Sequence, residues 1–372
     1  MNVLHISPRL RPGGVNQLAA DLASGLQQSG FRNTVVSPPN ELVGRMAAAS
    51  VQHHSSRNIA LFTYWNEYQR LRRLIHSTRA DIIMAYTTPA ASLASRVCQS
   101  MPEEERPSLI GIHTTYPKHP GWAASLNRCD AVVTISRHLR HELTRRAGHD
   151  EDQRDFWVIP YGVNEELCYP GYKPSPAWVE QWERQNKVSQ STLTFCIPGA
   201  ITPLRGLEDL PAILTRLTAA QVPVHAYIAG DTAKADQKYL HKLQKLFASS
   251  GVDKAITWLG HRPDLRDVIS QCGTVVSLAK APAGHDRVVL EALALGCPVA
   301  GYDHGVVGEL LDTFLPEGRV APGDVAGIAD RLEQWQAYRP HMQEALPYPY
   351  RLGDTIRSFA ELCISLRQGS KG

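Results

Sequence analysis

The sequence predicts an α/β protein with two domains, each built around a parallel β-sheet. Three observations carry this prediction. A chain of 372 residues is too long for one compact hydrophobic core. Short apolar runs of strand length alternate with amphipathic helical stretches along most of the chain, which is typical of parallel sheets covered by helices. The alternation stops once, near the middle of the chain, and then resumes.

The first stretch of alternation predicts a Rossmann-like domain over residues 1–170. Amphipathic helices are expected over residues 16–28 and 68–75, where apolar side chains recur at helical spacing. The apolar runs of strand length are residues 3–6, 34–37, 81–85, 109–112, 131–135 and 156–159.

The alternation stops over residues 169–192, where prolines precede a polar, glutamine-rich stretch that indicates a crossover between domains. A second Rossmann-like domain is expected over residues 171–349. Its predicted strands are residues 194–197, 224–229, 255–258, 274–278 and 298–301. Two facing units of this kind place the carboxyl ends of their strands around a deep interdomain cleft, where phosphate groups bind.

Residues 350–372 predict a last helix that returns to the first domain. One helical face of this segment is apolar. The side chains on that face are Leu352, Ile356, Phe359, Ala360 and Cys363.

Composition excludes several classes of protein. Apolar residues make up 43% of the chain and charged residues 20%, which is ordinary for a globular protein. The net charge is only +3 and the basic residues lack interleaved aromatics, so no nucleic acid is expected as a partner. Seven cysteines without a CxxC pair indicate neither a disulfide framework nor a zinc site, which fits a cytoplasmic location. No apolar run has the length of a signal peptide or a transmembrane helix, so any contact with the cytoplasmic membrane is expected to be peripheral.

Gly13 and Gly14 follow the first predicted strand and precede the first predicted helix. The N–H groups at such a helix start, together with the helix dipole, favour a bound anion such as phosphate. The stretch RPGGVN lacks the third glycine of a dinucleotide fingerprint, so binding of NAD is disfavoured. A plain tight turn is the alternative explanation for the glycine pair.

Two polar side chains follow predicted strands at the edge where a ligand is expected. Arg205 lies directly before Gly206 at a helix start, where a guanidinium can clamp a diphosphate with several donors. His113 ends the strand at 109–112, where an imidazole can hydrogen-bond to a sugar or a phosphate. The alternatives are a solvated arginine and a histidine packed in the core.

The stretch RVVLEALALGCPVAGYDHGVVGE, residues 287–309, places Glu291 in an otherwise apolar helix. We expect Glu291 on the first turn of this helix. Gly305 and Gly308, after the next strand, then offer backbone that a ligand can approach closely, which suits binding of sugar hydroxyls. The alternative is a carboxylate that only interacts with the helix dipole, worth about 0.3–1 kcal/mol.

The order of these stretches resembles the retaining GT-B glycosyltransferases of family four, which include bacterial enzymes of lipopolysaccharide and capsule assembly. The resemblance spans nearly the whole chain and implies a GT-B fold with two facing Rossmann-like domains. Besides the strand that ends at His113, it rests on the stretches RPGGVNQLAADLASGL, DIIMAYTTPAASLAS, DAVVTISRHLRHEL, VIPYGVNEELCYP, PGAITPLRGLEDL, HAYIAGD, ITWLGHRPDL and RVVLEALALGCPVAGYDHG.

The resemblance implies that a basic pair in the loop after the first strand of the second domain holds the donor diphosphate. Arg205 stands where the family has its usual lysine. Gly199 precedes the place of the usual arginine, but that place holds Ala200. Half of the positive charge on the phosphates is therefore expected to be missing. His261, within ITWLGHRPDL, also belongs to the implied donor-binding set.

The resemblance also implies two glutamates at the donor. Glu291 matches the second, which contacts the ribose hydroxyls, whereas Ala283 stands where the first is expected. Two explanations are open: Asp286 or Arg287 partly substitutes for the missing glutamate, or the donor sugar does not need that carboxylate. The loop that presents backbone N–H groups to the donor comprises Gly284, His285, Asp286 and Arg287.

Together, these residues predict a metal-independent hexosyltransferase with His113, Arg205 and Glu291 as its catalytic residues. Arg205 and main-chain N–H groups would stabilise the departing diphosphate, so no metal or other cofactor is expected. The acidic run Asp150-Glu151-Asp152 is expected to be a solvated charge run and not a manganese site. The expected partners are a UDP- or GDP-sugar donor and a glycan or lipid-linked acceptor, in assembly of lipopolysaccharide core or surface polysaccharide.

Two other functions remain open. Ala200 and Ala283 are consistent with a degenerate protein that binds a nucleotide or glycan without catalysis, and a GT-B glycosyl phosphorylase would use free phosphate in place of a nucleotide. The cation-rich stretches at residues 68–79 and 137–146 also carry leucines at helical spacing. They are either docking faces for anionic lipid or ordinary amphipathic helices.

Overall fold

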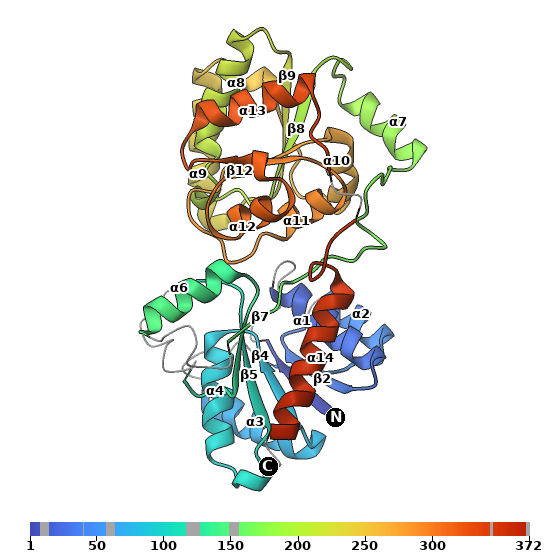
Figure 1. Ribbon diagram of the computed structural model, residues 1–372, viewed down its shortest axis with the longest axis vertical. Helices are drawn as coiled ribbons and strands as arrows, with labels where there is room; N and C mark the ends of the chain where they lie inside the picture. The colour runs from blue at the N-terminus through green and yellow to red at the C-terminus, as the bar shows by residue number, and fades with distance from the viewer. Residues whose placement is uncertain are drawn as a thin grey trace. The chain divides into compact units, whose positions relative to one another are not determined.

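The computed structural model describes residues 1–7, 15–39, 41–56, 64–116, 127–148, 156–342 and 345–369. The chain forms two compact units (Figure 1). Unit 1 comprises Met1–Gly162 and Tyr348–Gly372, and unit 2 comprises Val163–Pro347.

Unit 1 is built on a seven-stranded sheet in which all neighbouring strands are parallel. In sheet order the strands are β3 (Gln52–Ser55), β2 (Arg32–Ser37), β1 (Asn2–Ile6), β4 (Ile82–Ala85), β5 (Ser108–His113), β6 (Ala131–Thr134) and β7 (Phe156–Val158). The direction of strand addition reverses between β1 and β4, which makes this the topological switch point of the unit. Of these seven strands, β3 alone had no counterpart among the predicted strands, because its sequence QHHS has no apolar run.

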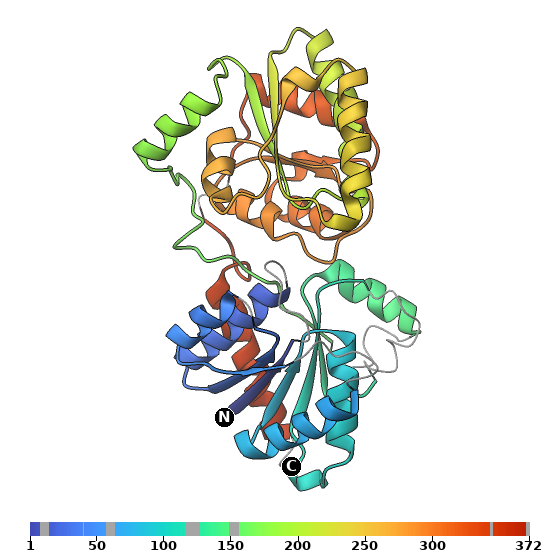
Figure 2. The ribbon, with the colours of Figure 1, turned by 180° about the vertical axis from the view of Figure 1, so that it is seen from behind.

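Alternate residues of the unit 1 strands enter different core clusters, as expected for a sheet covered on both faces. Val3 packs in one cluster with α1, α6 and α14, whereas Leu4 packs in another with α3 and α4. Figures 1 and 2 show α1 and α14 on one face of the sheet and α3 and α4 on the other. The helices are α1 (Val15–Gln28), α2 (Leu42–Ala48), α3 (Tyr64–Thr78), α4 (Thr88–Gln99), α6 (Arg137–Ala147) and α14 (Leu352–Gly369), with a short 3-10 helix η2 (Glu103–Glu105).

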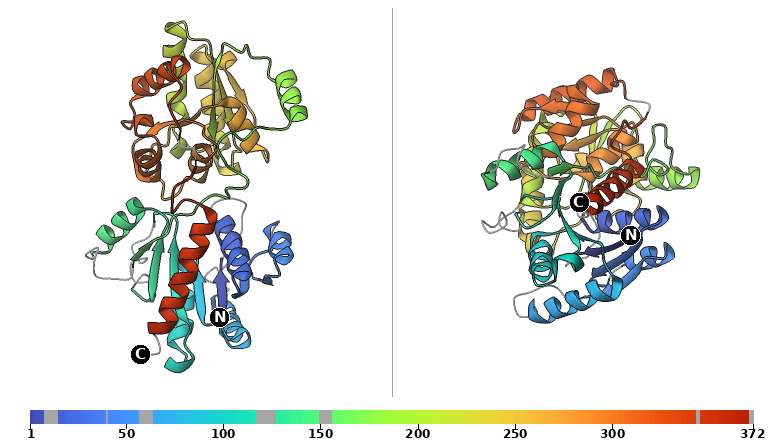
Figure 3. Two further views of the ribbon diagram at one scale, coloured as in Figure 1. Left: turned by 45° about the vertical axis from the view of Figure 1, so that its right-hand side comes forward. Right: turned by 60° about the horizontal axis from the view of Figure 1, so that its bottom comes forward.

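Helix α14 brings the end of the described chain onto the core of unit 1. Its predicted apolar face packs there, with Phe359 and Cys363 fully buried. It lies alongside α1 (Figure 3). A Cβ atom added at Gly25 of α1 would come within 2.2 Å of Ile356, so the two helices are in close contact. Thr355 also donates to the carbonyl of Pro160, which joins α14 to the segment where the chain leaves unit 1.

Unit 2 is built on a six-stranded parallel sheet. In sheet order its strands are β10 (Ile256–Trp258), β9 (Val224–Ala229), β8 (Leu193–Pro198), β11 (Val275–Ser277), β12 (Val299–Tyr302) and β13 (Arg319–Val320). Its switch point lies between β8 and β11, where Cys196 pairs with Val275. The α-helices are α7 (Pro176–Gln185), α8 (Leu210–Ala219), α9 (Gln237–Ser249), α10 (Leu265–Cys272), α11 (Arg287–Ala294), α12 (Gly305–Phe314) and α13 (Val325–Ala337). The 3-10 helices are η3 (Pro203–Arg205), η4 (Leu207–Asp209), η5 (Lys234–Asp236), η6 (Asp253–Ala255) and η7 (Pro316–Gly318).

Residues 169–192, interpreted from the sequence as a crossover between domains, contain a helix, α7, that the sequence analysis did not predict. Ser175 caps the helix start by accepting from the N–H of Trp178 at 3.3 Å. Trp178 stacks on the buried Trp182 at 5.2 Å between ring centroids, and Trp182 in turn contacts Tyr227 of β9. A serine cap followed by proline is a signal for a helix start, so the prolines begin an element here instead of breaking one.

No helix among the ranges described above is both long enough and apolar enough to cross a membrane.

Candidate functional site

The switch point of unit 2 brings together two of the loops singled out by the sequence. Arg205 ends η3, which follows β8, and α11 follows β11 on the neighbouring strand. Both loops leave the carboxyl ends of their strands, because the two strands are parallel and adjacent. This edge is the place where open α/β sheets bind ligands.

The Arg205 guanidinium is paired with the carboxylate of Asp286. Nη1 of Arg205 donates to Oδ2 of Asp286 at 2.7 Å. The Asp286 side chain is 1% exposed, whereas that of Arg205 is 31% exposed. The other oxygen, Oδ1, accepts from the N–H of Val289 at 3.3 Å and so caps the start of α11. Both oxygens of Asp286 are engaged and buried, so its carboxylate is poorly placed to replace the missing glutamate at the donor sugar.

Gly199 provides the surface on which the Arg205 guanidinium lies. Its φ of +114° is in the region that favours glycine. A Cβ atom at this position would stand 3.0 Å from Nη2 and 3.1 Å from Cζ of Arg205. Ala200, the next residue, is exposed and contributes no charge. The backbone conformation therefore favours glycine here, and a larger residue would also crowd the guanidinium.

Glu291 lies on the second turn of α11, and its predicted position on the first turn is wrong. The helix begins at Arg287 with Asp286 as its cap, so Glu291 is the fifth residue of the helix. Nε of Arg287 donates to Oε1 of Glu291 at 2.6 Å, and each of the two side chains is 24% exposed. The effect of the helix dipole falls off within the first turn, so interaction with that dipole does not explain why a carboxylate occurs at position 291.

Gly305 and Gly308 approach the protein's own chain, which corrects the expectation that they leave room for ligand. A Cβ atom at Gly305 would lie 2.8 Å from the backbone nitrogen of Ala283, and one at Gly308 would lie 2.5 Å from Oδ1 of Asp303. The N–H of Val306 also donates to the carbonyl of Ala283 at 3.0 Å. Both glycines allow α12 to pack closely, and the loop that carries Ala283 is held against the start of that helix.

His285 is an uncharged member of the loop before α11. Burial lowers the pKa of its imidazole to about 4, with a smaller opposing contribution from Asp286 and further lowering by Arg287 and Arg205. The imidazole is therefore neutral at pH 7 and lies within electrostatic reach of all three charged side chains. Gly284, beside it, is buried.

Lys280 is a charged residue of this region that the sequence analysis did not single out. It extends from the loop after β11 and pairs with Glu208 at 3.3 Å and with Asp209 at 3.0 Å. Tyr302 donates to Asp209 at 2.8 Å from the neighbouring β12. These contacts tie the loops after β8 and β11 to each other and to the end of β12. The sequence could have pointed to Lys280, because it is a cation that closely follows a predicted strand, as Arg205 does.

His113 lies in unit 1, at the carboxyl end of β5, as the sequence predicted. Its side chain is buried, and this burial lowers the pKa of the imidazole to about 4. His113 is therefore neutral at pH 7. His261 is exposed and follows β10, which β9 separates from the switch point at β8. Gly13 and Gly14 lie outside the described residues.

The acidic run Asp150-Glu151-Asp152 also lies outside the described residues. Within the described ranges, no group of three or more histidine, cysteine, aspartate or glutamate side chains is arranged to hold a metal ion.

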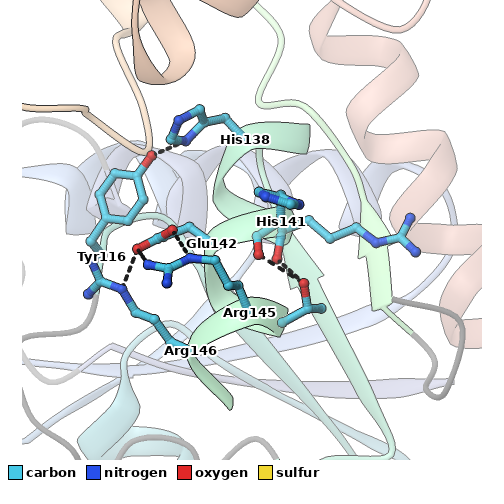
Figure 4. A network of polar contacts seen from close by, with 8 residues as sticks. Tyr116, His138, His141, Glu142, Arg145 and Arg146 are labelled. Carbon is cyan, nitrogen blue, oxygen red and sulfur yellow. Dashed lines mark hydrogen bonds and ion pairs between the residues drawn. The ribbon is translucent and has the colours of Figure 1, made fainter. Parts of the chain in front are cut away.

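The cation-rich helices α3 and α6 use their leucines in the core. Leu139 and Leu143 of α6 are fully buried, and Leu71 and Leu74 of α3 pack against the other face of the sheet. These leucines are therefore not a lipid-facing stripe, although the helical spacing was interpreted correctly. The outer surface of α6 carries a polar network (Figure 4).

In the network of Figure 4, Glu142 is the common acceptor. Arg145 donates to it at 3.0 and 2.8 Å, and Arg146 also pairs with it. Tyr116 and His138 are hydrogen-bonded to each other at 2.5 Å, and the Arg146 guanidinium lies 5.9 Å from the centre of the Tyr116 ring. At least two of the α6 cations are thus engaged within the protein itself.

Comparisons with known proteins agree with this arrangement. Residues 12–167 match the family described as Glycosyltransferase Family 4, and residues 179–346 match Glycosyl transferases group 1. No curated protein sequence matches the chain.

Solved structures with the same fold extend over almost the whole chain. A glycosyltransferase from Rickettsia africae has 16% identity and a TM-score of 0.78, and the match covers 98% of this chain and 93% of that one. Anabaena HepE in complex with UDP has 18% identity and a TM-score of 0.75, with 99% and 98% covered. The lipopolysaccharide outer core galactosyltransferase WaaB has 15% identity and a TM-score of 0.74, with 98% and 99% covered. The prediction of a GT-B fold is confirmed. With both halves of the chain matched in this way, the protein belongs to glycosyltransferase family 4, whose members transfer a sugar from a nucleotide sugar.

Proposed function

We propose that this glycosyltransferase uses a UDP-sugar and binds its diphosphate at the switch point of unit 2. The acceptor in this proposal is a glycan or lipid-linked glycan of lipopolysaccharide core or surface polysaccharide. The meeting of Arg205 with the start of α11 at adjacent carboxyl strand ends carries the proposal. Support for uridine comes from HepE, which has the same fold and was solved with UDP and with UDP-glucose.

In the proposed chemistry, the bond between the anomeric carbon of the sugar and the diphosphate oxygen breaks and a bond from that carbon to a hydroxyl oxygen of the acceptor forms. Negative charge then builds on the diphosphate, and the N–H groups of the partly exposed Arg205 stabilise it. The departing diphosphate takes up the proton of the acceptor hydroxyl. Glu291 accepts hydrogen bonds from the ribose hydroxyls. His113 contributes only as a neutral hydrogen-bonding group, because its buried imidazole is not protonated near pH 7.

A thermal-shift screen without added metal tests the proposal. UDP should raise the melting temperature of the 372-residue chain, because a ligand that binds only the folded state stabilises it. Stabilisation by inorganic phosphate but by no nucleoside diphosphate would instead indicate a phosphorylase. Stabilisation by UDP without hydrolysis or transfer of any UDP-sugar would indicate a binding protein that has lost catalysis.

The missing first glutamate has its own test. In the proposal, the donor sugar is bound without a carboxylate at position 283, where Ala283 lies beside the start of α12. Ala283→Glu should change the donor KM or kcat if a carboxylate can act from that position. Unchanged kinetics in a folded variant would count against any role for position 283 at the donor.

A further inference from the structure

Asp286 joins two parts of the donor site with a single carboxylate. Oδ1 caps α11 at the N–H of Val289, and Oδ2 accepts from Arg205. The carboxylate is 1% exposed, so neither contact is shared with bulk water. Moving Asp286 away from Arg205 would also uncap the helix, and a lost cap typically costs about 1 kcal/mol.

The guanidinium has neighbours on two sides. Asp286 accepts one N–H of Nη1, and Gly199 lies so near that a Cβ atom there would stand 3.0 Å from Nη2. Arginine has five N–H donors, so a single hydrogen bond leaves others for an incoming diphosphate. A side chain held in this way does not have to be ordered when charge develops on the leaving group, and such preorganisation is a large part of electrostatic catalysis.

We propose that Asp286 is the positioning residue for Arg205, an inference that rests on the donor site proposed above. It links the loop after β8, which carries Arg205, to the helix that carries Glu291. Its negative charge weakens the attraction of Arg205 for the diphosphate of the ground state, while its hydrogen bond fixes the geometry needed in the transition state. Loss of this carboxylate should therefore lower kcat without raising the donor KM.

Asp286→Asn tests whether kcat falls without a rise in the donor KM, because asparagine keeps the size and the capping oxygen but removes the charge. With UDP-glucose as the probe, kcat for metal-free hydrolysis should fall about 10-fold or more, while KM stays equal or falls. The matched control is Asp324→Asn, because Asp324 caps α13 in the same unit by accepting from Gly327 at 2.9 Å. This control should leave both constants unchanged.

A double-mutant cycle shows whether Asp286 acts through Arg205. Asp286→Asn should have no further effect on kcat in an Arg205→Ala background. Additive losses would overturn the inference, and so would an unchanged kcat in the single variant. A rise in both kcat and UDP affinity would also overturn it, since the carboxylate would then be a competitor of the phosphate.

A measurement without ligand separates this inference from the proposed function. In ¹⁵N-labelled protein, the guanidinium Nε–H signal of Arg205, assigned by its absence in Arg205→Ala, should be sharp in the wild type. It should broaden through exchange in Asp286→Asn and stay sharp in Asp324→Asn. Failure of the wild-type protein to bind any nucleoside diphosphate would contradict the proposed function. An unchanged Arg205 signal in Asp286→Asn would contradict the positioning role of Asp286.

Discussion

The two units share a parallel topology with a switch point, but the described side chains at the two switch points differ in chemistry. In unit 1, His5 of β1 bonds to Tyr86, which follows β4, at 2.8 Å and to Asn33 of β2 at 2.9 Å, and all three are buried. In unit 2, the loops that follow β8 and β11 carry the ion pair of Arg205 with Asp286.

The difference follows from burial. Full burial lowers the pKa of His5 to about 4, so the unit 1 network is made of neutral groups that stabilise the core. Arg205 keeps part of its surface exposed and remains charged, which costs stability but leaves donors for an anion. Among the described residues, the side chains that surround His5 thus form a buried, uncharged network, whereas Arg205 and Asp286 form a charged pair that is partly exposed.

Removal of the Arg205 charge from unit 2 should have the largest effect and tests the contrast between the two units most directly. Arg205→Ala should lower donor turnover by about 100- to 1,000-fold, the usual effect of deleting one electrostatic donor to a transition state. Its melting temperature should fall, because the buried carboxylate of Asp286 loses its ion-pair partner, so turnover is measured well below the melting temperature of the variant. Metal-free hydrolysis of UDP-glucose is the measurement. Arg216→Ala is the control, because Arg216 forms only an exposed pair with Asp330. A loss below about 10-fold would mean that Arg205 does not meet the diphosphate.

Mild acid should weaken unit 1 through its neutral histidines. The folded pKa of about 4 for His113 lies below the ordinary value of about 6.5, so the unfolded chain binds more protons between these values. The contribution of His113 to the free energy of unfolding is therefore fully present above pH 6.5 and is lost as the pH falls toward 4. The free energy of unfolding should fall by about 2 kcal/mol between pH 7 and pH 5.

Urea unfolding at pH 7 and pH 5 measures this effect. His113→Gln should reduce the loss of stability on acidification, whereas the exposed His261 replaced by glutamine should leave it unchanged. Equal pH dependence in the wild type and His113→Gln would show that the imidazole is not held neutral.

The ribose role of Glu291 gives a smaller effect. UDP should bind about 10-fold more tightly than its 2′-deoxy analogue, since hydrogen bonds to a carboxylate contribute about 1.5 kcal/mol or more. Glu291→Gln should reduce this preference in calorimetric titrations, while Glu333→Gln on α13 should keep it. Equal affinities for the two nucleotides in the wild type would remove the ribose role.

The smallest effect is expected at the charge cluster of unit 1. Hydrogen bonds from Arg145, opposed by desolvation and reinforced by Arg146, lower the pKa of Glu142 to about 2. The stabilisation that the ionised Glu142 gives the folded state is present above its ordinary pKa and is lost as the pH falls toward 2. At pH 7, Glu142→Gln should cost about 0.3–1 kcal/mol, and less at 1 M salt, because the partners are exposed. A loss of donor turnover in this variant would show that α6 serves the reaction and not only the surface.

The periodicity of side chains was enough to locate most of the sheet and the last helix. β6 and β9 lie where apolar runs predicted them, and the apolar face of α14 packs as its spacing required. These features are local, because burial of one face imposes a period on each element separately. The strand β3 and the helix α7 were missed, since one lacks apolar residues and the other begins among prolines that also suit a loop.

The sequence by itself determined the alternation of strands and helices, the loop that carries Arg205 and the family to which the chain belongs. Only the tertiary structure decided that Arg205 meets Asp286, 81 residues further along the chain, and that Glu291 lies one turn inside α11. The physical reason is that partners across a sheet depend on which strands become neighbours. The packing of the whole unit makes β8 and β11 neighbours. No repeating pattern of residues in either loop indicates this pairing.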